Sequence, residues 1–324
     1  MDETSVTESR STAGSRWQWV VRAVALLALL AVAWVCLTAW APVVHGHPAY
    51  PVLLALTVLG AVAALWRARR PRARPGTWRL LGRGLLLVLA VGWVAAMVWL
   101  RPFGAVEPAL AAMRSDASVE VTETATRIVL APAAGSTSEV GVFFQPGARV
   151  DARAYAAVLR PLAEAGHRVV IAKQPLGIAF LALPAFDAAR SAQPRVQRWV
   201  VGGHSLGGTV AAIQADAGDD DSAAPAVGLL LYASYPAGDV RGSLTTAVES
   251  VSGSNDGLAT PANIEASRAD LPAGATFTVI EGGTHAQFGS YGAQPGDGVP
   301  TISDEQARTL ITQASLRFVD SLDR

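Results

Sequence analysis

The sequence has little cysteine and no basic surface, two features that would each indicate a class of function. It contains one cysteine, Cys36, which cannot form an intramolecular disulfide and so leaves the redox compartment open. It also lacks a basic surface for nucleic acid, because residues 116–324 carry 14 basic and 22 acidic side chains. A net charge of −8 offers no basic stripe that could follow phosphates, which argues against nucleic-acid binding.

The first hundred residues contain three long apolar runs without a charged residue, at 23–44, 49–66 and 84–100. Each run is close to the ~17–25 residues that a membrane-spanning helix needs, and the last is the shortest. Six tryptophans lie at or near the ends of these runs, where interfacial aromatic residues belong. We therefore expect three transmembrane helices with a lipid bilayer as partner, since three buried helices of a soluble bundle would need polar faces.

The distribution of arginine predicts how these helices are oriented. Segment 67–83 holds seven arginines and no acid, whereas segment 45–48 holds no arginine. By the positive-inside rule, 67–83 and the tail 1–22 are cytoplasmic, and the chain beyond the third run lies outside the plasma membrane. One alternative stays open: Ala39-Trp40-Ala41 resembles a signal-peptidase site. Cleavage there would leave two spans and the same outward-facing C-terminal half.

After a linker at 101–117, the chain alternates strand-like and helix-like segments. The strand-like runs are 118–122, 126–131, 140–145, 168–172, 198–202, 226–233, 246–252 and 275–280. The helix-like segments are 151–165, beginning at the N-cap residue Asp151, and 185–193, 206–217, 261–269 and 304–322. This alternation predicts an α/β fold for 118–324, with a mostly parallel sheet covered by helices on both faces. Any chemistry is then expected in the loops at the carboxyl ends of the strands.

The segment GHSLG at 203–207 fits the G-x-S-x-G pattern of a nucleophile elbow. It directly follows a predicted strand and directly precedes a predicted helix, which is the setting that the pattern requires. Glycines two residues on either side of Ser205 allow strand and helix to pack closely around a strained turn. A dinucleotide-binding turn would be the rival interpretation, but no G-x-G-x-x-G pattern occurs here. Ser205 is therefore the predicted nucleophile.

A serine hydroxyl needs an adjacent base to take its proton. Of the five histidines only His285 comes after Ser205, in a loop that follows the predicted strand 275–280. Asp256 follows the strand 246–252 and would complete the order Ser, Asp, His, fixing the tautomer of His285 and stabilising its imidazolium. Asn-Asp-Gly is also a turn signal by itself, so other acids stay open. These alternatives are Asp239, Glu249 and Asp270.

An oxyanion hole needs two backbone N–H groups aimed at the developing charge. Leu206, directly after the nucleophile, is expected to supply one, and Gly147 or Ala148, after the third strand, the other. The pocket is expected to be shallow, because only the residues 233–246 separate the sixth and seventh strands. Its expected walls are Phe180, Leu181, Phe288 and Tyr291. No motif implies a metal or a cofactor.

With these residues placed, residues 118–324 resemble an α/β-hydrolase-fold domain of the compact bacterial type, often membrane-tethered at the N-terminus. The matching segments are FFQPGARVDARAY, RVVIAKQPLGIAFL, WVVGGHSLGGTVAA, LLLYASYPA, SGSNDGLATPANI and EGGTHAQFGSYGAQPGDG. The last two surround Asp256 and His285 and support both assignments. Ala148 stands where a second glycine is expected. The three apolar runs are extra to the resemblance, which implies hydrolase chemistry and names no substrate.

The expected function is a membrane-anchored serine hydrolase that cleaves an ester, thioester or related acyl bond of a small molecule through an acyl-Ser205 intermediate. An acyltransferase would use the same triad, with an alcohol replacing water. A non-catalytic binding or sensing domain on the same fold is the alternative from another class, and a fluorophosphonate probe would distinguish it. A channel or transporter is disfavoured, because the three apolar runs contain no charged side chain.

The orientation can be tested directly. Alkaline phosphatase fused after Arg324 should be active, and protease added to intact spheroplasts should digest a tag at the same position. Both outcomes require 84–100 to span the membrane, and its 17 residues are at the lower limit for a helix. A protected tag with inactive phosphatase would place the domain in the cytoplasm.

Overall fold

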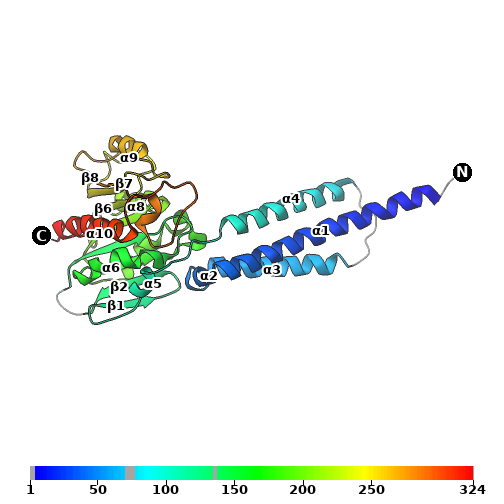
Figure 1. The fold of residues 1–324 in the computed structure, drawn as a ribbon, viewed down its shortest axis with the longest axis horizontal. Coiled ribbons are helices and arrows are strands. Elements are labelled where there is room, and N and C mark those ends of the chain that lie inside the picture. The colour runs from blue at the N-terminus through cyan, green and yellow to red at the C-terminus, as the bar shows by residue number, and fades with distance from the viewer. Residues whose placement is uncertain (1–3, 70–76, 134–136, 324) are drawn as a thin grey trace. The chain divides into compact units, whose positions relative to one another are not determined.

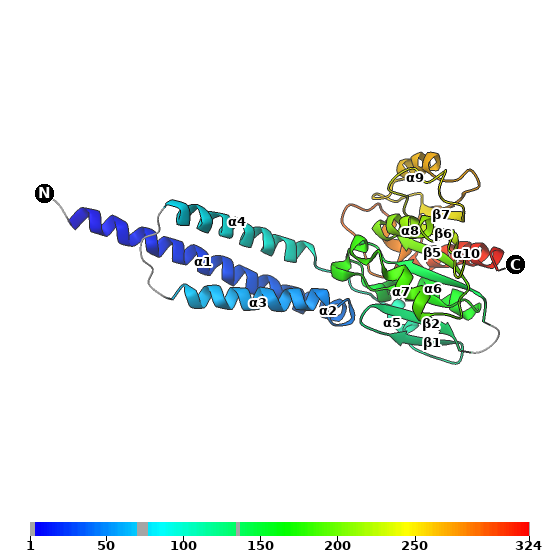
Figure 2. The same ribbon diagram turned by 180° about the vertical axis from the view of Figure 1, so that it is seen from behind.

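The computed structural model describes residues 4–69, 77–133 and 137–323, which are drawn as a ribbon in Figures 1 and 2. Residues 1–3 of the predicted tail and 70–76 of the predicted cytoplasmic connection therefore lie outside the described residues. The chain divides into two compact units, and each is considered by itself.

The first unit comprises residues 1–44 and 48–101 and is helical. Its long helices are α1 (Thr4–Thr38), α3 (Ala49–Arg67) and α4 (Thr77–Trp99), and α1 packs against both of the others. Three stretches of them are long and apolar enough to cross a membrane: Trp17–Thr38, Ala49–Arg67 and Thr77–Trp99. Most of their side chains are exposed within the unit, which suits helices whose solvent is lipid.

The first apolar run does not form one helix over 23–44. Helix α1 ends at Thr38, and a short helix α2 (Trp40–His45) follows. Pro42 explains the break, because its ring would clash with the carbonyl of residue 38 in a continuous helix. The Thr38 carbonyl instead accepts a hydrogen bond from Arg101 Nη2 at 2.9 Å, and Arg101 Nε donates to Thr38 Oγ1 at 2.8 Å. The third span is longer than expected, since α4 begins at Thr77.

The second unit comprises residues 45–47 and 102–324 and is built on one eight-stranded sheet. The strands are β1 (Val119–Glu123), β2 (Arg127–Pro132), β3 (Val140–Gln145), β4 (Val169–Ala172), β5 (Arg198–His204), β6 (Ala226–Tyr232), β7 (Ala247–Gly253) and β8 (Thr276–Ile280). Their order is β1-β2-β4-β3-β5-β6-β7-β8. Strand β2 pairs antiparallel with both neighbours, and every pair from β4 to β8 is parallel.

Helices cover both faces of this sheet (Figures 1 and 2). The longer helices are α6 (Ala156–Glu164), α7 (Ala185–Ala192), α8 (Leu206–Asp216), α9 (Pro261–Ser267) and α10 (Asp304–Ser321). Successive strand residues point to opposite faces, so each strand contributes to two cores. Phe144 packs in the core that α6 and α10 cover, whereas the adjacent Phe143 packs in the core under α7 and α8. The central strands β4, β3, β5 and β6 are therefore buried on both faces, as a parallel sheet requires, whereas the edge strands β1 and β8 are partly exposed.

The sheet register brings the carboxyl ends of neighbouring strands together. Gln145 of β3 lies beside Gly203 of β5, and His204 lies beside Tyr232 of β6. The loops that follow β3, β5, β7 and β8 therefore leave the sheet at one edge. This is the edge at which a parallel α/β sheet binds its ligands.

The expected α/β architecture with a mostly parallel sheet is confirmed, and each predicted strand is present with bounds shifted by at most two residues. Two details differ. The predicted helix 151–165 begins as a short 3₁₀ turn, η1 (Ala152–Tyr155), with Asp151 as its N-cap. The predicted linker 101–117 packs mostly within the second unit, because it forms helix α5 (Ala109–Ala112) and Phe103 pairs with Val150.

Candidate active site

Ser205 lies on a sharp turn between β5 and α8, in a backbone conformation that few residues adopt. Its φ is 52° and its ψ is −128°, outside the regions that non-glycine residues favour. The turn is held from both sides, since Ser205 N–H donates to the Tyr232 carbonyl at 3.0 Å and Ser234 Oγ donates to the Ser205 carbonyl at 2.6 Å. A strained residue that the surrounding structure fixes in this way is typical of a functional site.

Three glycines around Ser205 make the turn possible. A Cβ atom on Gly203 would lie 2.4 Å from the carbonyl carbon of Gly207, where the strand and helix cross. One on Gly207 would lie 2.2 Å from the carbonyl oxygens of Gln145 and Pro146, at the end of β3. One on Gly208 would meet Ser234 at 2.5 Å. The glycines of the pattern therefore serve close backbone approach, and they set α8 directly against the loop after β3.

His285 and Asp256 form a buried pair at the same sheet edge. His285 Nδ1 lies 2.9 Å from Asp256 Oδ2, and the two side chains are 1% and 0% exposed. Asp256 is held by its other oxygen, which accepts the backbone N–H groups of Leu258 and Ala259 at 2.8 Å each. His285 opens the 3₁₀ turn η5 (His285–Phe288), which a Thr284 and Gln287 capping box begins. Residues 29 positions apart are thus brought into contact by β7 and β8.

This pairing determines what the other nitrogen of His285 can do. An ionised carboxylate only accepts hydrogen bonds, so Nδ1 donates and Nε2 carries the lone pair. Nε2 of His285 is buried and has no hydrogen-bond partner among the residues that the structure describes. A buried acceptor without a partner in a native fold calls for an explanation. The arrangement can supply a base at the sheet edge where the half-buried Ser205 lies on its turn.

The alternative acids lie elsewhere. Asp239 forms an exposed ion pair with Arg241 at 2.7 Å. Glu249 is buried within β7, where its carboxylate accepts the hydroxyls of Thr276 and Thr278. Asp270 belongs to the short turn η4 (Arg268–Asp270). Only Asp256 among the four candidates contacts His285.

The predicted oxyanion donors fall into two groups. The N–H groups of Leu206 and Ala148 have no hydrogen-bond partner within the described parts of the chain, and that of Leu206 is at the first position of α8. The N–H of Gly147 instead donates to Tyr155 Oη at 2.9 Å, so it is not available to an oxyanion. Of the two residues expected for the second donor, Ala148 is therefore the one whose N–H is not already bonded within the described parts of the chain. Ala148 stands where a second glycine was expected, but an alanine has the same backbone N–H to donate.

Tyr155 and His204 form a buried pair that sequence reasoning missed. Tyr155 Oη accepts the N–H of Gly147 and forms a second hydrogen bond, of 2.8 Å, with His204 Nδ1. Burial raises the pKa of Tyr155, which keeps the hydroxyl protonated. Burial, with the neighbouring His285 as the second cause, holds the pKa of His204 well below its usual value. The pair therefore stays neutral and joins the loop after β3 to the elbow.

Asp297 is a second residue that the sequence did not single out. Its carboxylate accepts the backbone N–H groups of His285 at 3.1 Å and Ala286 at 2.8 Å. It also accepts the N–H of Gly257 at 3.1 Å, next to Asp256. Asp297 thus ties the loop that carries His285 to the loop that carries Asp256. The only signal for it was its place in the segment that resembles the hydrolase pattern.

The four predicted pocket residues separate into two pairs. Phe180 and Leu181, on the short turn η3 (Ala179–Ala182), are 43% and 53% exposed. Phe288 and Tyr291 are 1% and 5% exposed, and the Phe288 ring stacks on His204 at 5.9 Å. These two rings pack next to His204 of the elbow and are too buried to offer a substrate much surface. Among the described residues, no group of three His, Cys, Asp or Glu side chains could hold a metal ion.

The Tyr155 and His204 link can be tested with Tyr155→Phe. The change leaves the Gly147 N–H and His204 Nδ1 buried without a partner, which costs about 1–3 kcal/mol in the free energy of unfolding. We expect kcat for a p-nitrophenyl ester to fall as well, because the loop that carries Ala148 loses its attachment to the elbow. Tyr232→Phe is the control, since it removes the contact to Ser315 Oγ in the same core. Equal losses of kcat in both variants would show that Tyr155 acts only on stability.

Comparison with known proteins adds a family. A sequence model of the alpha/beta hydrolase family matches residues 141–309. A search of curated proteins finds no match. Among solved structures, a dienelactone hydrolase-like promiscuous phosphotriesterase from metagenomic libraries is similar, with 17% identity, 63% of this chain and 96% of that chain covered, and a TM-score of 0.45.

Two esterases are similar to the same extent. For an esterase from Pyrobaculum calidifontis the identity is 14%, the coverage 66% of this chain and 88% of that chain, and the TM-score 0.46. For a thermophilic esterase from Thermogutta terrifontis the values are 13%, 64%, 95% and 0.45. The family match covers more than half of the 324 residues and includes Ser205, Asp256 and His285. The chain therefore belongs to the alpha/beta hydrolase family.

Proposed function

We propose that this protein is a membrane-anchored serine hydrolase that cleaves an ester, thioester or related acyl bond of a small molecule. The observation that carries the proposal is the buried Asp256 and His285 pair, whose unpartnered Nε2 lies at the same sheet edge as the strained Ser205. A nucleophile, a base and a residue that orients the base are the three parts that acyl transfer requires. Membership of the hydrolase family supports the same chemistry.

In the first half of the reaction Ser205 Oγ attacks the carbonyl carbon of the substrate. His285 Nε2 takes the hydroxyl proton, and Asp256 stabilises the imidazolium through Nδ1. The tetrahedral intermediate carries a negative oxygen, to which the N–H groups of Leu206 and Ala148 donate. Collapse of this intermediate breaks the bond to the leaving alcohol or thiol, which receives the proton from His285. The product is an ester between the acyl group and Ser205.

In the second half a water molecule replaces the leaving group. His285 Nε2 takes a proton from the water as its oxygen attacks the acyl carbon. The same two N–H groups receive the negative oxygen of the second intermediate. Its collapse returns the proton to Ser205 Oγ and releases the carboxylic acid. Ser205 and His285 are thereby returned to their starting protonation states, and no cofactor takes part in this scheme.

The three apolar helices are proposed to anchor this chemistry in the plasma membrane. Segment 67–83, between the second and third apolar runs, holds seven arginines, and by the positive-inside rule this favours the cytoplasmic side for the connection. An odd number of crossings then places Ser205 outside the cytoplasm. Its substrates would be small external esters or acyl compounds. The lipid bilayer is the only macromolecular partner in this proposal.

Replacement of the nucleophile tests the proposal most directly. Ser205→Ala should abolish labelling by a fluorophosphonate probe and lower kcat for p-nitrophenyl butyrate by several orders of magnitude. The free energy of unfolding should not fall, because the variant keeps the backbone and loses only an oxygen. Ser191→Ala, an exposed serine on α7, should label like the wild type. Persistent labelling of Ser205→Ala would show that Ser205 is not the nucleophile.

The acid can be tested with a matched pair of variants. Asp256→Asn keeps the shape of the side chain but can hold His285 in the wrong tautomer, and kcat should fall by roughly 10⁴-fold. Asp239→Asn removes the same charge from an exposed ion pair and should leave kcat unchanged. The measurement is the rate of p-nitrophenyl ester hydrolysis by each purified variant. A collapse in Asp239→Asn with normal activity in Asp256→Asn would reverse the assignment.

A further inference from the structure

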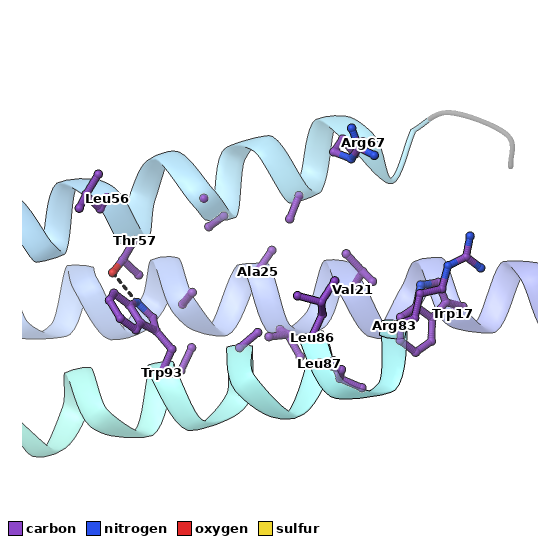
Figure 3. Close-up of a pocket in the computed structure, with 17 residues that line it drawn as sticks. Trp17, Val21, Ala25, Leu56, Thr57, Arg67, Arg83, Leu86, Leu87 and Trp93 are labelled. Atoms are coloured by element: carbon purple, nitrogen blue, oxygen red, sulfur yellow. Dashed lines mark hydrogen bonds between the residues drawn. The ribbon is translucent and has the colours of Figure 1, made fainter. Parts of the chain in front are cut away.

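A groove of about 650 Å³ lies among α1, α3 and α4 of the helical unit (Figure 3). Its volume is within the ~300–1,000 Å³ typical of ligand sites. Its walls are mainly alanine, leucine and valine side chains, and Gly60 of α3 leaves open space where a side chain would be. The helices around it are held together, since Arg22 of α1 donates to the Ala68 carbonyl at the end of α3 at 3.1 Å.

The two ends of the groove differ in chemistry. Arg67, Arg83 and Trp17 lie at one end, each from a different helix (Figure 3). At the other end Trp93 Nε1 donates to Thr57 Oγ1 at 2.9 Å, so these polar groups are already paired. None of the described residues that line the groove is acidic. The groove is therefore cationic at one end and apolar along the rest of its length.

The length of the groove matches one leaflet of a bilayer. Thr57 and Arg67 are ten positions apart on α3, and Arg83 and Trp93 are ten positions apart on α4. At ~1.5 Å per residue this is about 15 Å, half of the ~30 Å hydrocarbon core of a membrane. The arginine end flanks the connection that the positive-inside rule places in the cytoplasm. The groove thus runs from the cytoplasmic interface to the middle of the membrane.

We propose that this groove binds one anionic phospholipid of the cytoplasmic leaflet, with its phosphate on Arg67 and Arg83 and an acyl chain along the apolar walls. Guanidinium groups bind phosphate oxygens with two parallel hydrogen bonds, and basic pockets between membrane helices suit anionic headgroups. Trp17 is the first residue of the first candidate span, and the ends of spans are where interfacial aromatics belong. The site rests on the proposed membrane anchoring and does not depend on the catalytic triad.

The full-length protein, purified in detergent and stripped of lipid, can be titrated with dioleoylphosphatidylglycerol, dioleoylphosphatidylcholine or inorganic phosphate, with bound ligand counted by native mass spectrometry. We expect one phosphatidylglycerol per chain, bound at least ten-fold more tightly than phosphatidylcholine, and no retained phosphate. Equal binding of both lipids would overturn the proposal, because they share their acyl chains and differ in headgroup charge. Retention of phosphate without lipid would also overturn the proposal, because the arginines would then bind a free anion and not a phospholipid.

Two pairs of variants separate the headgroup site from the chain site. Arg67→Gln with Arg83→Gln should weaken phosphatidylglycerol binding at least ten-fold, whereas Arg69→Gln with Arg79→Gln removes equal charge outside the groove and should not. Gly60→Leu should weaken binding of the lipid by filling the groove. Gly92→Leu is its control, since Gly92 also has open space at Cβ but does not line the groove. Equal effects within either pair would contradict the site.

Failure of this proposal can be told apart from failure of the proposed function. Extraction of membranes with alkaline carbonate tests the anchoring, and fluorophosphonate labelling of the same preparations tests Ser205. A chain that stays in the membrane and labels normally, but shows no lipid preference, would overturn the lipid site alone. A lipid-free dimer that Gly60→Leu dissociates would assign the groove to a second copy of the chain and overturn the lipid site as well.

Discussion

The close approach of strand β5 and helix α8 at Ser205 is the constraint on which the catalytic unit depends. Ser205 can hold a φ of 52° only because glycines stand where the backbones of β5, α8 and the loop after β3 nearly touch. The same approach sets Gly207 of α8 against the carbonyls of Gln145 and Pro146, so one turn fixes both Ser205 and the start of the loop after β3. Such strain costs of order 1–3 kcal/mol, which the buried sheet must offset.

Two buried hydrogen-bond systems then hold the loops of the sheet edge in register. Tyr155 and His204 join the loop after β3 to the elbow, and both stay neutral because they are desolvated. Asp297 joins the loops after β7 and β8 by accepting three backbone N–H groups around the base and the acid. Neither system contains a proposed reacting atom. Their effect is to fix the positions of Ser205, Asp256 and His285, and in the proposed mechanism such preorganisation would stabilise the transition state electrostatically.

The helical unit follows different physics. Its helices expose apolar side chains, so lipid rather than a protein core would be their solvent. Polar contacts join residues far apart in the chain: Arg101 binds the carbonyl that Pro42 frees at Thr38, and Trp93 binds Thr57. Loose packing among three helices leaves a groove with arginines at one end. A cavity that would destabilise a water-soluble core can serve in a membrane as a place for an acyl chain.

Much of the fold could be read from the sequence, because strand and helix signals here are local. The apolar runs from β3 to β8 predict the strands and the helices between them to within a few residues of their observed bounds. The G-x-S-x-G pattern marks Ser205 at the turn between β5 and α8. The break at Pro42 was equally local, yet hydropathy averages over it and predicts one helix. The order Ser, Asp, His similarly limits the residue that pairs with His285 to a few acidic candidates. It does not show which of them contacts His285.

Tertiary structure decided what depends on residues far apart in the chain. The contact of Asp256 with His285 separates that acid from Asp239, Glu249 and Asp270, and only the register of β7 and β8 creates it. Tyr155 takes the N–H of Gly147 and so leaves Ala148 as the free donor, which no local pattern signals. Sequence determines which chemistry a chain carries, because residue types and periodicity are local. Only packing decides which groups meet, because distance in space is not encoded by distance along the chain.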